Sequence, residues 1–182
     1  MEGNKIIFDS ETGGFNKEKN ALCELGAIVV NSENEIIESL QYYVKPYRRE
    51  MSEELCSYKP DAMAINGITE QQIAEGHLVE LVLQKFIKLI IDHDVQTIIG
   101  HNSDAFDVNW VSYLLGRFTP YQQYFDQIRK VDTLKLAQAR MDCRPENYKL
   151  GTLCVYYGIE IVDAHTAIGD CTATLELYKR LM

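Results

Sequence analysis

Five residues in this chain are of types that can carry out hydrolysis, and all lie in or beside apolar segments: Asp9, Glu11, Asp107, His165 and Asp170. Burying carboxylates costs free energy unless a partner compensates them. Four converging carboxylates cannot neutralise one another, so a hard divalent cation such as Mg²⁺ or Mn²⁺ is their natural partner. Cations held by carboxylates, with a histidine able to take a proton, suit the attack of water on a phosphodiester.

The spacing of these residues supports a shared site, although each motif also has a plainer interpretation. Asp9 and Glu11 are two positions apart, so on a strand they point to one face. Asp107 opens a helical stretch, where an acid also stabilises a first turn without any catalytic role. His165 and Asp170 are five apart and would not share a helix face. We therefore expect the histidine before a helix and the aspartate in its first turns.

Hydrophobic patterning predicts the elements that would position these side chains. Five segments are typical of strands, namely 5–9, 21–31, 35–45, 95–100 and 128–134. Five longer segments are typical of helices, namely 79–92, 105–118, 134–141, 150–158 and 169–181. Between residues 46 and 78 the pattern is irregular, with Thr69 as the expected cap of a short helix.

This order of elements predicts an α/β fold with a five-stranded mixed sheet and helices on both faces. The polar residues 31–34 suggest a hairpin between the second and third strands. The first strand is expected at the centre, because it is the shortest and most evenly apolar. Its carboxyl end would then lie beside the end of strand 95–100, the kind of edge where sites of open α/β sheets form.

Size and composition are those of one ordinary globular domain, residues 1–182, with 46% hydrophobic and 25% charged residues. The start of the chain lacks a signal-peptide pattern and no stretch approaches a membrane span, so we expect a cytoplasmic protein with no membrane partner. The net charge of −9 argues against a wide basic face for nucleic acid. Two bound divalent cations would locally offset this negative charge. We therefore expect a small contact with nucleic acid, such as the end of one DNA or RNA strand.

Three segments together resemble the motifs of the DEDDh, or DnaQ-like, family of 3′→5′ exonucleases. They are Asp9-Ser10-Glu11-Thr12, His101-Asn102 followed by Phe106-Asp107, and His165 followed by Asp170. The resemblance spans nearly the whole chain and implies a ribonuclease H-like fold. ETGGFN is similar to ribonuclease T, whereas HNSDAFD and HTAIGD are similar to three-prime repair exonucleases; proofreading ε subunits share the overall plan.

The resemblance also implies roles for the five residues in a two-metal-ion mechanism. Asp9, Glu11 and Asp170 would hold one Mg²⁺, and Asp9 would bridge to a second that Asp107 supports; Mn²⁺ would substitute. His165 would be the general base that takes a proton from the attacking water. The products would be nucleoside 5′-monophosphates released from a 3′ end.

Further residues are expected to contact the substrate. Thr12 and Gly13 could approach the terminal sugar, and Phe15 could stack on the last base. The other candidates are His101, Asn102 and Phe106; for Phe106, packing in the core is the stronger interpretation. The expected partner is the 3′ end of a single strand, with DNA slightly favoured over RNA. A ribonuclease T-like exoribonuclease and an inactive nucleic-acid-binding scaffold are the alternatives, and the sequence leaves monomer or homodimer open.

Overall fold

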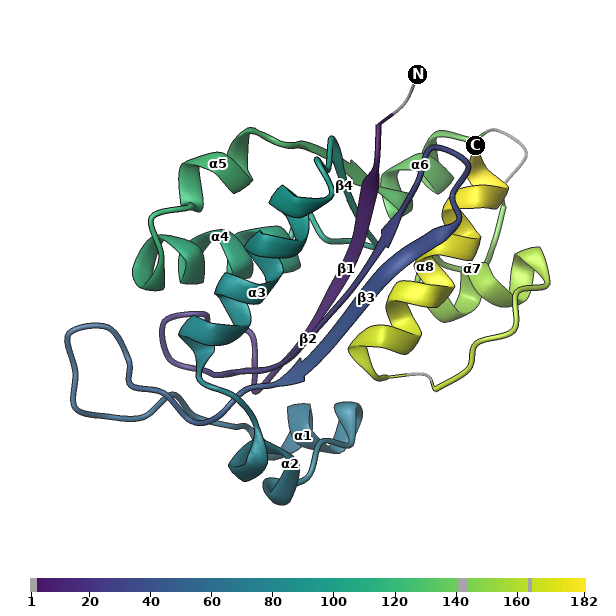
Figure 1. The fold of residues 1–182 in the computed structure, drawn as a ribbon. Coiled ribbons are helices and arrows are strands. Elements are labelled where there is room, and N and C mark those ends of the chain that lie inside the picture. Colours follow the sequence, from purple (N-terminus) through teal and green to yellow (C-terminus); the bar gives the residue numbers. More distant parts are fainter. Residues whose placement is uncertain (1–2, 141–143, 164) are drawn as a thin grey trace.

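A computed structural model describes residues 3–140, 144–163 and 165–182, which form a five-stranded mixed sheet with helices on both faces (Figure 1). The strands are β1 Lys5–Thr12, β2 Leu22–Val30, β3 Ile36–Tyr43, β4 Thr97–Gly100 and β5 Arg129–Asp132. The helices are α1 Pro60–Asn66, α2 Glu70–Glu75, α3 Val79–Asp92, α4 Asp107–Phe118, α5 Gln122–Gln127, α6 Thr133–Ala139, α7 Leu150–Tyr157 and α8 Ala167–Leu181. No described helix has the length and apolar character needed to span a membrane.

The sheet has the order β3-β2-β1-β4-β5, so β1 is central as expected. It pairs antiparallel with β2 and parallel with β4, and β4 pairs parallel with β5. The expectation that β1 is the shortest strand was wrong, because it has eight residues whereas β4 and β5 have four each. Its central place follows from apolar side chains on both of its faces, since both faces are covered by helices.

Strand β1 is longer than its apolar run predicts. We expected it to end at Asp9, but its pairing with β2 continues, with Glu11 opposite Glu24 and Thr12 opposite Leu22. Backbone pairing therefore carries the strand through polar residues that follow the apolar run 5–9. Because Glu11 is on the strand, it shares one face with Asp9.

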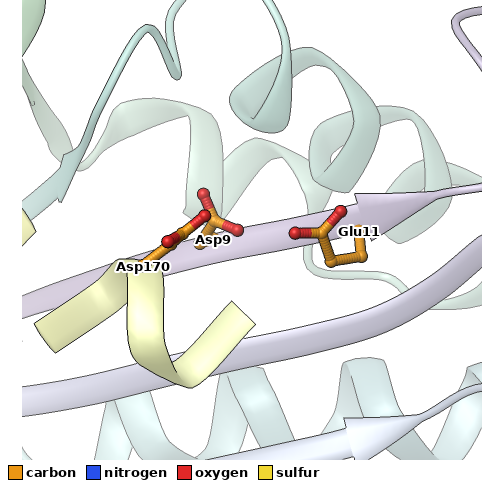
Figure 2. Close-up of side chains that lie close together, drawn as sticks. All are labelled: Asp9, Glu11 and Asp170. Carbon is orange, nitrogen blue, oxygen red and sulfur yellow. The ribbon is translucent and has the colours of Figure 1, made fainter. Parts of the chain in front are cut away.

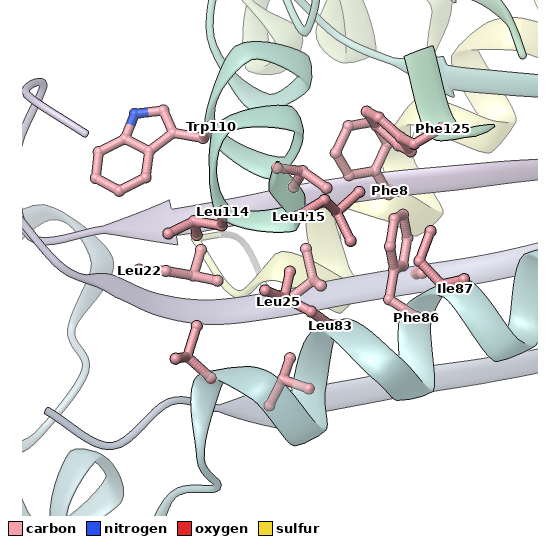
Figure 3. Packing of buried hydrophobic residues seen from close by; sticks show 14 of the residues in the cluster. Phe8, Leu22, Leu25, Leu83, Phe86, Ile87, Trp110, Leu114, Leu115 and Phe125 are labelled. Atoms are coloured by element: carbon pink, nitrogen blue, oxygen red, sulfur yellow. The ribbon is translucent and has the colours of Figure 1, made fainter. Parts of the chain in front are cut away.

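The larger hydrophobic core fills the space between the sheet and helices α3, α4 and α5 (Figure 3). The rings of Phe8, Phe86 and Phe125 pack with centroid separations of 5.7 to 6.3 Å. Sequence analysis did not predict helix α5, because only Phe125 of its six residues is buried and the segment has no helical periodicity.

The opposite face of the sheet carries α8. Its buried Cys171, Leu175 and Tyr178 pack against Ile7 of β1 and Ile28 of β2. Odd-numbered β1 residues thus face α8, and even-numbered residues such as Phe8 face α3 and α4. This alternation directs Asp9 and Glu11 toward α8.

The irregular segment after β3 forms α1 and α2, which lie beyond the carboxyl end of β1 (Figure 1). The predicted cap is confirmed, because the Thr69 hydroxyl accepts from Gln72 N while the Gln72 side chain accepts from Thr69 N. Helix α1 adds the far wall of a cavity that begins at the end of β1.

Candidate active site

Three carboxylates meet where β1 ends against the start of α8 (Figure 2). Asp9 and Glu11 come from one face of β1, and Asp170 comes from the first turn of α8. One oxygen from each lies within 4.8 Å of the other two. Residues separated by about 160 positions in the sequence are thus close enough to share one ion.

The first turn of α8 has the local geometry that the sequence predicted. Thr166 is the N-cap, and its hydroxyl accepts from Gly169 N at 3.1 Å. His165 lies before the helix and Asp170 within its first turn. Placing aspartate in this turn also puts negative charge near the positive end of the helix dipole.

Asp107 lies beside this cluster, but its carboxylate is hydrogen-bonded to Ser10 of β1. It is the first residue of α4 and is almost fully buried, and its Oδ1 accepts from both the backbone N–H and the hydroxyl of Ser10. Ser10 is on the face of β1 that α4 covers. Three of the four predicted carboxylates therefore form the group that could hold an ion, and Asp107 adds negative charge close to Asp9.

The carboxyl groups of the cluster and of Asp107 have raised pKa values. Burial raises the pKa of Asp9 well above its ordinary value, and the charges of Asp107 and Asp170 raise it further. Burial and neighbouring carboxylates raise the pKa of Glu11 to about 7. Burial also raises the pKa of Asp107 to about 6, although its bonds with Ser10 oppose the shift.

No lysine or arginine in the described ranges forms an ion pair with Asp9, Glu11 or Asp170. Oxygen-only ligands without a compensating cation fit a hard divalent ion, which would replace protons on these groups. The residues present therefore suit the metal that the sequence predicted.

Removing divalent cations should make the stability of this protein depend on pH. A carboxyl whose pKa is higher in the folded state favours folding while it is protonated, and this advantage disappears as the pH rises from the unfolded pKa through the folded one. For Glu11 that window runs from 4.5 to about 7. We expect the melting temperature in EDTA to fall by roughly 5–10 °C between pH 5 and pH 8, measured by circular dichroism.

Excess Mg²⁺ or Mn²⁺ should remove most of this decrease, because the cation compensates the ionised carboxylates. His101 acts in the opposite direction, since burial lowers its pKa, but it is one group against five carboxyls whose pKa values are raised. Equal stability at both pH values in EDTA, or greater stability at pH 8, would contradict the electrostatic account of the site.

His165 is exposed and lies outside the carboxylate group. Its φ of 65° is in the left-handed region, which is uncommon for a residue with a side chain. Its backbone N–H donates to the Asp170 carboxylate. The main chain is thus fixed beside the cluster, and the imidazole faces solvent at its edge.

His101 and Asn102 line a cavity of about 550 Å³ that reaches Asp9 and Asp170. His101 is bonded through both ring nitrogens, at 2.9 Å to the Thr133 hydroxyl and 2.9 Å to the Tyr148 carbonyl. It therefore joins the end of β4 to the segment before α7. Asn102 is exposed with φ 56°, so its side chain is the more accessible of the two.

Phe15 projects from the turn after β1 with 87% of its surface exposed. It lies edge-on to Phe106, with ring centroids 6.0 Å apart. Both line a cavity of about 310 Å³ that also contacts Glu11 and Ile65 of α1. Phe106 additionally packs against the core beside Trp110, as its plainer interpretation predicted.

Thr12, the last residue of β1, and Gly13, the first residue after it, are both buried. Gly13 donates to the Ala21 carbonyl and accepts from Lys59 N, so both of its backbone groups are engaged within the protein. A Cβ at this position would lie 2.7 Å from the Ser57 carbonyl oxygen. Close packing of the chain accounts for the glycine, and the expected contact of Gly13 with a sugar stays a prediction.

Sequence analysis missed Glu24, a carboxylate on β2 with no exposed surface. It stands in the apolar run ALCELGAIVV. The argument applied to Asp9, that an acid in an apolar strand needs a partner, could have identified it. Helix α1 was also missed as a wall of the Phe15 cavity, because its contact with β1 is formed only in the folded chain.

Comparison with known proteins bears on the family and the fold of this chain. A family model for the RNase T type of exonuclease matches residues 6–178. Ribonuclease T of Shewanella baltica is 28% identical, with 97% of this chain and 80% of that protein covered. A PolC-type DNA polymerase III of Caldanaerobacter subterraneus is 24% identical over this whole chain, which spans 12% of that polymerase.

Solved structures of exonuclease I have the same fold. One is 25% identical with a TM-score of 0.79, over 98% of this chain and 40% of that one. A zinc-bound complex of the E. coli enzyme with single-stranded DNA is 24% identical with a TM-score of 0.81. The expected α/β fold with a five-stranded mixed sheet is therefore confirmed. Since the family model covers nearly all of the chain, this protein belongs to the RNase T family of exonucleases.

Proposed function

We propose that this protein is a 3′→5′ exonuclease that uses divalent cations to remove nucleoside 5′-monophosphates from single-stranded DNA. The observation that carries the proposal is the group of three carboxylates within 4.8 Å, next to the cavity beside Phe15. A cavity of about 310 Å³ has room for one nucleoside, and it adjoins Glu11. A scissile phosphate beside the carboxylates would then join the last nucleotide to the rest of the strand.

Each acidic residue has a role in this proposal. Asp9, Glu11 and Asp170 bind the cations, for which Mg²⁺ is the expected ion and Mn²⁺ a substitute. Asp107 supports the second ion from beside Asp9. Bound cations would stabilise the attacking and leaving oxygens of the phosphodiester.

His165 would accept the proton of the attacking water, because its imidazole is the exposed basic group at the edge of the cluster. Its backbone bond with Asp170 keeps the ring within reach while the side chain can still rotate.

The remaining residues would bind the strand. Phe15 would stack on the last base, with Phe106 behind it, and Thr12 would lie beside the terminal sugar. Asn102 would reach the phosphate from the opposite side, and His101 would hold the turn that presents it.

The choice between DNA and RNA rests on the relatives, which include proteins of both kinds. Exonuclease I structures with dT13 and dA16 oligonucleotides resemble this fold, whereas the ribonuclease T relative aligns over a larger share of its own length. An exoribonuclease is therefore the second candidate. An inactive scaffold is disfavoured because all five expected residues are present.

The deciding experiment uses matched 5′-labelled DNA and RNA single strands, with Mg²⁺ or with EDTA. A ladder that shortens from the 3′ end only with the cation is the expected result, and the polymer degraded faster identifies the substrate. A strand that carries a 3′-phosphate serves as the control that cleavage depends on a free 3′ hydroxyl at the end of the strand. The proposal fails if neither polymer is cut with Mg²⁺ or Mn²⁺.

Replacing Phe15 with Ala should weaken binding of single-stranded DNA by roughly 5- to 150-fold, since stacking contributes about 1–3 kcal/mol per base. The melting temperature should not change, because the ring is exposed. Fluorescence anisotropy in Ca²⁺, which should slow cleavage, measures the affinity.

Val155→Ala, at an exposed apolar residue of α7, is the matched control and should bind like the wild type. Unchanged affinity in the Phe15 variant would remove this residue from the proposed site.

A further inference from the structure

Glu24 is a fully buried carboxylate that the proposed reaction does not use. One of its oxygens accepts from Gln41 Nε2 on β3, and the other accepts from the backbone N–H of Ala167 at 3.1 Å. An ionisable side chain is seldom buried to this degree, and both of its partners are donors. A carboxylate is suited to this position because it accepts on both oxygens.

The Ala167 N–H belongs to the first residue of α8. Backbone N–H groups in the first turn of a helix have no partner within the helix. Thr166 satisfies the N–H of Gly169 locally, whereas Glu24 satisfies that of Ala167 from a strand 143 positions away. The beginning of α8 is thus held to β2 by a specific tertiary bond.

Gly26 allows the backbone of β2 to approach the first turn of α8 closely. A Cβ at this position would lie 2.6 Å from the Ala167 carbonyl carbon and 2.8 Å from Ile168 N. The Cys171 thiol also contacts the Gly26 carbonyl oxygen at 3.4 Å. We refer to Glu24, Gly26 and Ala167 as the β2–α8 clamp.

Strand register connects the clamp with the carboxylate cluster. Gly26 is directly opposite Asp9 on the neighbouring strand, and Glu24 is directly opposite Glu11. Glu24 and Gly26, which hold the start of α8, are thus the cross-strand partners of the carboxylates on β1. Asp170 is three residues beyond Ala167, so its position over β1 depends on this junction.

We propose that Glu24 is a positioning residue, which holds the first turn of α8 so that Asp170 completes the cation site with Asp9 and Glu11. The inference rests on the proposed function for its consequences in catalysis. Its role is that of a hydrogen-bond acceptor. The charge itself is unfavourable so close to three other carboxylates.

Three variants separate these roles. Glu24→Leu has similar volume and no acceptor. Glu24→Gln keeps an acceptor for Ala167 N, provided that the Gln41 amide rotates to present its oxygen. Gly26→Ala leaves Glu24 intact but forces α8 away from the strand, so it tests the same junction if the leucine variant does not fold.

Mn²⁺ binding, measured by calorimetry without nucleic acid, is the main readout. Glu24→Leu and Gly26→Ala should each weaken Mn²⁺ binding by roughly 10- to 100-fold, the range found when groups that orient metal ligands are removed. Hydrogen exchange at the first-turn amides of α8 should become faster. On DNA, kcat should fall more than KM rises, and Glu24→Gln should recover most of each loss.

Leu83→Ala is the matched control, because it opens a cavity in the core on the other face of the sheet. It should lower stability yet bind Mn²⁺ like the wild type. The proposal is overturned if Glu24→Leu binds Mn²⁺ within twofold of the wild type, or if Glu24→Gln is as impaired as Glu24→Leu. Binding and exchange require no substrate, so they decide the clamp even if the wild type degrades neither DNA nor RNA.

Discussion

Replacing Asp9 with Asn should abolish nuclease activity, with a decrease in kcat/KM of about a thousandfold or more. Asp9 is the central member of the cluster, and its pKa is raised by burial and by the charges of Asp107, Asp170 and Glu11. The amide keeps the shape of the side chain but removes a negative charge that a cation needs. A gel assay with 5′-labelled DNA measures activity, and calorimetry with Mn²⁺ should show binding weakened to a comparable degree.

The same substitution should make the protein more stable at pH 8 without cations, because it removes repulsion among buried carboxylates. A loss of activity from misfolding would instead lower stability. Asp104→Asn is the matched control, since Asp104 pairs with Lys135 outside the cluster. The account of the site would be wrong if Asp9→Asn kept near-normal activity, or if Asp104→Asn lost as much.

Replacing His165 with Asn should lower kcat by roughly 100- to 10,000-fold, the usual contribution of a general base. Asn is the suitable replacement because it tolerates the left-handed backbone that His165 adopts. Unlike Asp9→Asn, this variant should bind Mn²⁺ normally, since the imidazole lies outside the carboxylate group. Rates at saturating DNA, with Mn²⁺ calorimetry in parallel, separate the two effects.

His93→Asn provides the comparison, because His93 is a histidine that contacts Glu38 and lies far along the chain from the cluster. Wild-type kcat in His165→Asn would show that another group accepts the proton. If His165→Asn also lost Mn²⁺ binding, its role would be to position Asp170 rather than to act as a base.

Much of the fold could be predicted because its elements carry strong local signals. Helix α3 begins and ends where its apolar periodicity predicts. The order of strands and helices was sufficient to predict a five-stranded mixed sheet with helices on both faces. The end of β1 could not be placed, because Glu11 and Thr12 are held by pairing with β2 rather than by their own hydrophobicity.

The residues of the candidate site likewise divide into those that the sequence predicted and those that it did not. Asp9, Glu11 and Asp170 stood out as acids in apolar segments, and the structure brings them together. Glu24 was overlooked, although the same reasoning applies to it. Its significance depends on the contact with Ala167, which the sequence does not reveal.

The sequence by itself determined the chemical character of this protein, because residue type and spacing fix which side chains share a strand face or a helix turn. Only the tertiary structure decided that Asp107 bonds with Ser10 while three other carboxylates form one group. It also decided that Phe15 projects beside a cavity completed by α1. The physical reason is that local patterns specify directions along one element, whereas distances between elements are set by how their side chains pack.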